Sequence, residues 1–380
     1  LSELRAASLI LAEESGEVMR FRMLETLRQY AEERLQASED VETIVNRHRL
    51  FYLSLAETAQ RGLVTKEQKS WLDRLESEHD NFRLILAGDY SDTIGLQIAS
   101  DLQQFWDMRG YIKEGRAHLA RHMAHAEGAP PLVRLCAANA AGGLATRVQD
   151  LATARKYFEQ AVQICRESGN RRNLPGMLAN LGRTAQEMNA LEDAERFLSE
   201  ALQEFIQLGT EPQRQAQCLS FLASLANDQK RPALAVAYAE RSLAILRPLE
   251  DWVNISATLA ALGTAHFQCG DIDAAEECYR EALRISVELG NPNSLAHGLL
   301  HSALIEGARG NIEDAVRLQS AAQWIWKQLF DREASLSGVH REVLGNLPSK
   351  VLPERHAQLW QEGQLLGKKR LKELGAAKRH

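Results

Sequence analysis

The sequence predicts an all-α protein, a right-handed α-solenoid of paired helices preceded by a small module of a different kind. Three observations predict it. Small residues recur every 40 or 41 positions through the middle of the chain, and further small residues follow each of them at fixed distances. Between them, apolar residues recur at three- and four-residue steps, the period of an α-helix. Turn residues such as Gly169, Gly209 and Gly290 separate the helical stretches.

The first forty residues differ from the rest. Residues 8–24 hold an apolar stretch, a turn signal at Ser15-Gly16 and then an alternation of apolar and polar residues, which predicts a short β-hairpin. An amphipathic helix is expected directly afterwards, from Leu24 to Leu35. We therefore delimit a first module at residues 1–37.

Residues 38–128 are expected to form a helical linker region with one degenerate repeat. Two helices are predicted, over about residues 40–63 and 66–87. In the degenerate repeat Gly110 marks a turn, and Gly115 precedes Ala154 by thirty-nine residues. The paired prolines within residues 127–132 form the clearest internal boundary, because proline stops one helix and can start the next.

Residues 129–333 contain five repeats, each predicted to be two antiparallel helices. Small residues belong where two helix backbones approach to roughly 8–10 Å. Gly270 can take a positive φ at the turn between the helices, and Asp271 can cap the helix that follows. One pair cannot bury its own apolar face, so the pairs are expected to stack. The recurring positions are Gly142, Gly182, Ala223, Gly263 and Ala303, then Ala154, Ala194, Ala235, Ala275 and Ala315, then Ala161, Ala201, Ser242, Ala282 and Ala322.

The last part of the chain, residues 334–380, is expected to be a helical cap with a basic tail. The pattern of the repeats fades after Arg332, and we interpret the stretch up to about Arg355 as irregular linkage before a final helix. Lys368 to His380 carries six Lys or Arg against one Glu. This tail is expected to be a solvated helix end.

These repeat positions resemble the tetratricopeptide repeat, with its small residue in the first helix, alanine opening the second, an aromatic residue four positions later and alanine seven positions later. The resemblance covers about Leu132 to Glu333 and implies a tetratricopeptide-repeat superhelix. The units depart from the family pattern by running to 40 residues rather than about 34. The third unit also has Lys230 where glycine would ease the turn.

A second resemblance spans nearly the whole chain. The hairpin with "FRMLETLRQYAEERL" resembles the end of the winged-helix module in bacterial signal-transduction ATPases with numerous domains, relatives of LuxR- and AfsR-type regulators. The strings "WLDRLESEHDNFRLIL", "FWDMRGYIKEGRAHL" and "LWQEGQLL" are similar to stretches of that family's C-terminal arm. The resemblance implies an upstream nucleotide-binding domain and an arm that senses an inducer or partner. The nucleotide-binding residues cannot be carried over, because the chain begins after them, and no effector domain is visible.

Composition argues against several classes of function. The 380 residues are 45% hydrophobic and 25% charged, which is typical of a folded protein. A net charge of −6 argues against general affinity for nucleic acid or anionic membrane, and no apolar stretch approaches the length of a membrane span. Five scattered cysteines without a C-x-x-C pair indicate neither a disulfide framework nor a zinc site. With no signal peptide visible, we expect a cytoplasmic protein. The absent initial Met suggests a fragment.

Two kinds of motif could bind a phosphate group or a metal ion, but each is explained more simply by helix packing or solvent exposure. "GQLLGKKR" from Gly363 is one residue short of a phosphate-binding loop and lies in a helical stretch. His118, His122 and His125 share one helix face, but the repeat register places His122 at a core position. His297 and His301 form another i, i+4 pair, for which helix packing is the default and a role in the groove is an alternative. We therefore predict no catalytic residues, no cofactor and no metal.

The concave groove is the more promising place for function. In tetratricopeptide superhelices the first helix of each pair lines the concave side. The carboxylate-clamp pattern of Lys and Asn is not recognisable here, which argues against a chaperone C-terminal peptide as ligand. Each residue of the lining can equally be solvated surface. The candidate groove residues are Asn139, Arg147, Arg183, Gln186, Glu187, Gln217, Ser220, Ser224, Asn227, Asp228, Thr264 and Gln268.

The sequence thus predicts a non-enzymatic sensing arm that binds a protein, peptide or small effector and regulates an attached ATPase. The alternative is a free-standing adaptor that holds a partner in its groove. An enzyme with its site on the solenoid has no motif in its favour.

Overall fold

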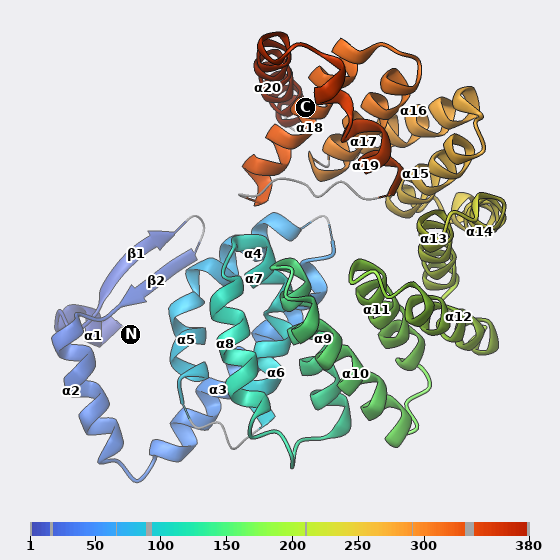
Figure 1. Cartoon of the computed structure of the whole chain (residues 1–380). Coiled ribbons are helices and arrows are strands. Elements are labelled where there is room, and N and C mark those ends of the chain that lie inside the picture. Colours follow the sequence, from blue (N-terminus) through green and yellow to red (C-terminus); the bar gives the residue numbers. More distant parts are fainter. Residues whose placement is uncertain are drawn as a thin grey trace. The chain divides into compact units, whose positions relative to one another are not determined.

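The computed structural model (Figure 1) describes residues 2–15, 18–65, 67–88, 93–209, 211–290, 292–330 and 338–377. The described chain is almost entirely helical, as predicted. Its internal contacts divide it into two compact units, Leu1–Val148 and Gln149–His380. The division falls within the first of the five predicted repeats, between its two helices. Each unit is described below by itself.

The N-terminal unit opens with a β-hairpin, which confirms the prediction from the alternating residues. Strand β1 (Leu11–Ser15) pairs antiparallel with β2 (Val18–Arg22), and Leu11 lies opposite Arg22. The predicted turn residue Gly16 lies outside the described residues. A short helix α1 (Ser2–Ala6) precedes the hairpin, and helix α2 (Glu25–Gln36) follows it.

The rest of the N-terminal unit is a helical bundle around Phe82, Phe105 and Trp106, which are fully buried. The expected helix over residues 66–87 is two helices, because the first ends at Ser77 and Glu78 leaves the helical conformation. The predicted turn at Gly110 is confirmed by its φ of +83°. The helices are α3 (Val41–Gly62), α4 (Gln68–Ser77), α5 (His79–Leu86), α6 (Thr93–Asp101), α7 (Gln103–Arg109), α8 (Ile112–Met123) and α9 (Pro131–Arg147).

The C-terminal unit is a stack of helix pairs (Figure 1). It begins with α10 (Leu151–Glu167), the second helix of repeat 1. Four complete repeats follow, each made of a first and a second helix. They are α11 (Leu174–Glu187) with α12 (Leu191–Leu208), α13 (Pro212–Asp228) with α14 (Pro232–Leu246), α15 (Trp252–Gln268) with α16 (Ile272–Glu288), and α17 (Pro292–Ala308) with α18 (Ile312–Phe330).

Close helix approach explains the recurring small residues. A Cβ added to Gly182 would lie 2.7 Å from Leu198, and one added to Gly263 would lie 2.7 Å from Tyr279, so each glycine admits a large side chain of the second helix. The alanines that follow twelve residues later, including Ala194 and Ala275, are fully buried. The predicted register of the repeats is therefore confirmed.

The turn inside each pair uses one left-handed residue at the same repeat position. Positive φ values occur at Gln149, Asn189, Lys230, Gly270 and Gly310, again 40 or 41 residues apart. Glycine takes this conformation without strain, whereas other residues pay a small cost in backbone energy. The Asp271 carboxylate accepts a hydrogen bond from the Ala274 backbone N–H at 3.1 Å, which confirms the predicted cap.

The chain after α18 is more regular than expected. The prediction of irregular linkage is wrong for residues 338–350, which form helix α19 (Gly338–Leu344) and a short 3-10 helix η2 (Leu347–Lys350). Apolar residues here are buried against α17 and α18, which favours helix. Helix α20 (Pro353–Ala377) then packs along α18. The expected boundary at residue 333 lies outside the described residues.

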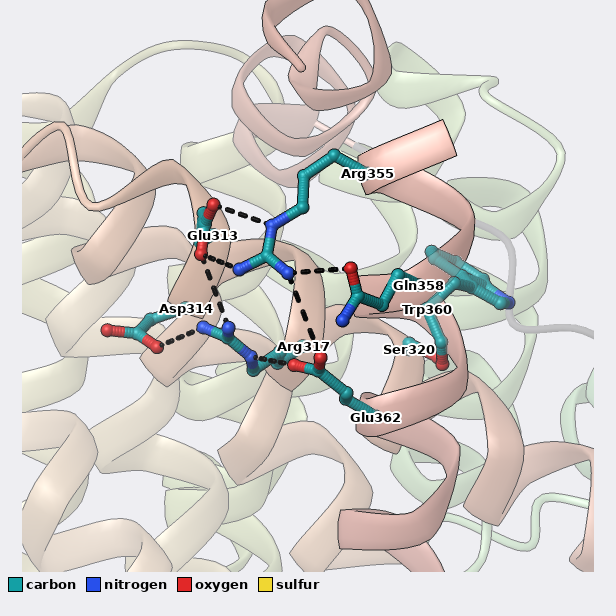
Figure 2. A network of polar contacts seen from close by, with 8 residues as sticks. All are labelled: Glu313, Asp314, Arg317, Ser320, Arg355, Gln358, Trp360 and Glu362. Atoms are coloured by element: carbon teal, nitrogen blue, oxygen red, sulfur yellow. Dashed lines mark hydrogen bonds and ion pairs between the residues drawn. The ribbon is translucent and has the colours of Figure 1, made fainter. Parts of the chain in front are cut away.

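The seam between α18 and α20 combines ion pairs with close backbone packing. Figure 2 shows Arg355 of α20 bonded to Glu313, with Nε 2.9 Å from the carboxylate, and Arg317 bonded to Glu362 at 2.6 Å. Gly363 and Gly367 face the α18 backbone so closely that a Cβ at either would overlap it. The glycines of "GQLLGKKR" thus serve helix packing.

Candidate binding site on the first-helix face

Ten of the twelve candidate residues lie together in the C-terminal unit, on the first helices of repeats 2 to 4. We call the surface formed by the first helices α11, α13, α15 and α17 the first-helix face. Asn139 and Arg147 lie on α9 in the N-terminal unit, where Arg147 Nε is 2.6 Å from the Asp107 carboxylate. The ten residues are Arg183, Gln186 and Glu187 of α11, Gln217, Ser220, Ser224, Asn227 and Asp228 of α13, and Thr264 and Gln268 of α15.

Side-chain hydrogen bonds connect α11 to α13. The Gln186 amide donates to Ser224 Oγ at 3.2 Å and to Asp228 Oδ2 at 2.6 Å. Desolvation raises the pKa of Asp228, while the bond from Gln186 acts in the opposite direction. The two helices therefore present a pre-arranged polar surface whose carboxylate is held by a neutral donor.

Arg183 adds an exposed positive charge to this surface. Its guanidinium lies 4.9 Å from the centre of the Phe221 ring and 3.6 Å from the Glu187 carboxylate. An ion pair this exposed is weak, and the ring contact adds modestly to the orientation of the guanidinium. Arg183 can thus meet an anionic group without losing a strong internal partner.

Two backbone contacts connect α13 to α15. Asn227 is 5% exposed and donates through Nδ2 to the Ala261 carbonyl at 2.8 Å, and Gln268 donates through Nε2 to the Asn227 carbonyl at 3.0 Å. The amide oxygens Asn227 Oδ1 and Gln268 Oε1 are buried and accept no hydrogen bond from the described protein groups. Both are acceptors, so they suit a ligand that donates N–H or O–H groups.

Three of the candidate residues are less available to a ligand. Ser220 is buried. The Thr264 hydroxyl is engaged with the Ala260 carbonyl at 3.0 Å and with the Tyr279 hydroxyl at 2.9 Å. Gln217 is exposed, at the start of the face, and its amide lies 3.5 Å from Asn254. The polar candidates that are exposed or partly exposed are therefore Arg183, Gln186, Asp228 and Gln268, whereas Asn227 is buried like Ser220.

Helix α19, which the sequence did not predict, covers part of the same face. Glu342 of α19 lies 2.8 Å from Lys230, and Asp228 Oδ1 would lie 3.5 Å from a Cβ at Gly338. Val339 joins a buried cluster with Tyr279 and Leu304. The signal was present in the sequence as Val339 and Val343, spaced by four between Gly338 and Gly345, although seven helical residues are too few to stand out.

Four of the five histidines singled out in the sequence, His118, His122, His297 and His301, pack against other side chains, whereas His125 is exposed. His122 is 1% exposed and fills the space beside Gly95, where a Cβ would lie 2.4 Å from its ring. His118 stacks on Trp106, and His301 stacks on Tyr279 with ring centres 4.2 Å apart. The described part of the chain contains no group of three or more His, Cys, Asp or Glu side chains arranged to hold a metal ion.

Among the described residues, no helix has the length and apolar character that crossing a membrane requires.

Comparison with known proteins confirms the repeats. A tetratricopeptide-repeat family model matches residues 133–203 and 214–288. Sequences of Mycobacterium tuberculosis and Mycobacterium bovis, named as HTH-type transcriptional regulators, are 35% identical over 111 residues. The match covers 28% of this chain and 12% of those relatives, so the chain corresponds to a small part of their length.

Solved structures share the fold. The Rap protein complexed with competence and sporulation factor has a TM-score of 0.54 and 14% identity, over 87% of this chain and 98% of that one. The apo quorum sensor NprR from B. thuringiensis has a TM-score of 0.50 and 15% identity, over 86% and 96%. A signal-transduction ATPase with a tetratricopeptide-repeat sensor from Pyrococcus horikoshii has a TM-score of 0.50 and 14% identity, over 94% and 60%. The chain thus contains tetratricopeptide repeats over residues 133–203 and 214–288 and shares the α-solenoid fold of these structures.

Proposed function

We propose that this chain is a non-enzymatic sensing arm that binds a protein or peptide segment and thereby regulates an attached signalling ATPase. The observation that carries the proposal is the polar surface across α11, α13 and α15. There two buried amide oxygens, Asn227 Oδ1 and Gln268 Oε1, accept no hydrogen bond from the described protein groups. A buried acceptor without a donor costs free energy, which a ligand that supplies the donor would recover.

An extended peptide segment fits this chemistry. Its side chains would meet Arg183 and Asp228, and its backbone N–H groups would bond to the amide oxygens of Asn227 and Gln268 once a local shift uncovers these buried atoms. Opposite charges at these two positions favour one direction of binding over the other. The fold is shared with a Rap protein that was crystallised with competence and sporulation factor, which is consistent with a separate factor as the ligand of this chain.

Regulation of an ATPase is supported by the hairpin and by the comparisons. The hairpin resembles the end of a winged-helix module, and its Leu11, Met19 and Phe21 are 43–46% exposed. The fold is shared with a signal-transduction ATPase that has a tetratricopeptide-repeat sensor, and the partial match to transcriptional regulators is consistent with control of gene expression. We propose that ligand binding favours one arrangement of the arm over another, which is a shift of populations.

The alternative is a free-standing adaptor in the cytoplasm, with the same face and no ATPase. The mass of the native polypeptide in its cells of origin separates the two. A mass well above the 42.5 kDa of this sequence supports an attached ATPase and directs attention to nucleotide-dependent assembly. A mass near 42.5 kDa contradicts the sensing arm and favours the adaptor.

A peptide library tests the binding face itself. Peptides selected on the parent chain from a randomised library of extended segments should lose at least tenfold in affinity for the double variant Arg183→Glu/Asn227→Ala. Arg196→Glu is the matched control, because Arg196 is an exposed arginine on the second helix α12. Circular dichroism should show unchanged helicity in both variants. Equal affinity of the double variant and the control would place the binding face elsewhere.

A further inference from the structure

The first-helix face changes from polar to apolar along the stack. The residue after each recurring small position is Arg183, Ser224, Thr264 and then Leu304. Four residues after the same small positions the side chains are Gln186, Asn227, Phe267 and then Gly307, which has none. The face of repeats 2 and 3 can therefore lie in water, whereas the face of repeats 4 and 5 would expose apolar surface unless something covered it.

Helix α19 is what covers it. Val339 is buried in one cluster with Leu304 and Ile305 of α17 and Tyr279 of α16, and Phe267 of α15 and Val343 pack against that cluster. Gly307 lies against Val343 and Leu347. The helix also reaches repeat 3, through the Lys230–Glu342 ion pair. Figure 1 shows α19 beside α17.

Helix α19 contributes few buried side chains to the cluster through which it contacts the first-helix face. Val339 is its one side chain below 9% exposure in that cluster, and Val343 is half-buried. Both partners of the Lys230–Glu342 pair are more than half exposed, so the pair adds little. Beneath the helix, His340 packs on His301 with ring centres 5.1 Å apart, and its buried Nε2 has no hydrogen-bond partner among the described groups.

The cap that follows α19 is held independently. Helix α20 is attached to α18 by the Arg355–Glu313 and Arg317–Glu362 pairs and by the Ser320 hydroxyl, which donates to the Trp360 carbonyl at 2.6 Å (Figure 2). Leu344, the last residue of α19, and Leu347 of η2 are fully buried in a core that contains residues of α17, α18 and α20. Residues 338–343 can therefore leave the face only if Leu344, η2 and α20 stay in place.

We propose that α19 is a removable, autoinhibitory occupant of the first-helix face, and that the surface beneath it takes an amphipathic helix of the same chemistry from a partner. That chemistry is two apolar residues spaced by four, as in Val339 and Val343, with an acidic residue directly before the second, as in Glu342. This helix is a partner distinct from the extended peptide of the proposed function. Only its role in regulating the sensing arm rests on the proposed function, whereas the docking of α19 does not.

A peptide supplied in trans tests the proposal. The probe is a labelled synthetic peptide of residues 338–350, added to the full chain and to the full chain with Val339→Asp/Val343→Asp. The variant should bind the peptide at least tenfold more tightly than the parent, whose face is already occupied. A peptide with the same two Asp substitutions is the control and should bind neither chain. Equal binding of the native peptide to both chains, or to neither, would overturn the proposal.

A milder variant guards against loss of folding. Val339→Ala/Glu342→Lys removes part of the apolar contact and places two lysines together at Lys230. It should bind the native peptide more tightly than the parent does, by a smaller factor than the Asp variant. Circular dichroism establishes that each variant keeps the helicity of the parent. If the milder variant is folded and binds the peptide no better than the parent, the proposal fails. Because this assay uses no sensed ligand, it fails or succeeds independently of the peptide-library experiment.

Discussion

Repeats 2 and 3 and repeats 4 and 5 are built on one register yet present different surfaces. Leu198 and Tyr279 occupy the same repeat position and both fill the space over a glycine of the first helix. In repeats 2 and 3 the first-helix face above this core is polar and open, with Gln186 bonded across to Asp228. Beyond Thr264 and Gln268 of α15, the face of repeats 4 and 5 is apolar around Phe267 and Leu304, where α19 covers it. The repeat thus determines the packing of the helices, while the residues between the recurring positions determine what each stretch of the face can bind.

The largest expected effect comes from truncating one core side chain in repeats 4 and 5 and, for comparison, one in repeats 2 and 3. Tyr279→Ala should destabilise the C-terminal unit by about 3–5 kcal/mol, because it leaves a cavity between α15, α16 and α17. It should also release α19, because Val339 packs in the same cluster. Leu198→Ala, the matched variant, should cost about 2–5 kcal/mol and leave α19 in place. Urea denaturation measures stability, and trypsin cleavage after Arg341 reports release. Equal trypsin cleavage after Arg341 in the two variants would contradict the difference drawn between repeats 2 and 3 and repeats 4 and 5.

A smaller effect is expected from pH. Burial lowers the pKa of His301, and it lowers the pKa of His340 to about 4. His297 of α17 further lowers both pKa values, and Tyr279 and the Lys230–Glu342 ion pair are the other ionisable groups that lie nearby. The unfolded or undocked state therefore binds more protons below about pH 6.5, and repeats 4 and 5 should lose roughly 1–3 kcal/mol between pH 7 and pH 4.

Repeats 2 and 3 provide the internal control for pH. Residues 174–246 contain no histidine. Asp228 titrates in the opposite sense, because its raised pKa makes the folded state bind the proton first as the pH falls. Hydrogen exchange at pH 7 and pH 5, corrected for the intrinsic rate, should show loss of protection in α17 and α19 with little change in α11 and α12. A uniform loss across the unit would contradict this prediction.

The smallest expected effect is the loss of one hydrogen-bonding residue between repeats 2 and 3. Gln186→Ala removes the bonds to Ser224 and Asp228, and should destabilise the unit by about 0.5–1.5 kcal/mol. The pKa of Asp228 should rise further, because the bond from Gln186 lowers it. An NMR titration of the Asp228 carboxyl measures the change. An unchanged pKa would show that the bond does not hold the carboxylate in solution.

The helix pairs could be predicted from the sequence because each depends on local signals. Gly263, Ala275 and Asp271 are respectively a close-approach residue, a seam residue and a helix cap, and each acts within one repeat. The ten candidates of the C-terminal unit could be mapped for the same reason. Whether each of them binds a ligand stays a prediction.

The cover over repeats 4 and 5 could not be predicted in the same way. The contacts that α19 makes through Val339 and with Lys230 join elements far apart in the sequence, and the spacing of Val339 and Val343 is too short a local signal to predict them. The engagement of Thr264 with Tyr279 and the free oxygens of Asn227 and Gln268 also depend on tertiary packing. The split at Glu78 was missed because the apolar period continues through it.

Hydrogen exchange of the full chain, resolved to individual segments, tests the central claim most directly. If α19 is a removable cover on a stable stack, the amides of residues 339–344 should exchange at least ~100-fold faster than those of α17 and α18, because local release needs far less free energy than global unfolding. Exchange of α19 at the same slow rate as α17 would contradict the account, since α19 would then be a fixed part of the repeat core.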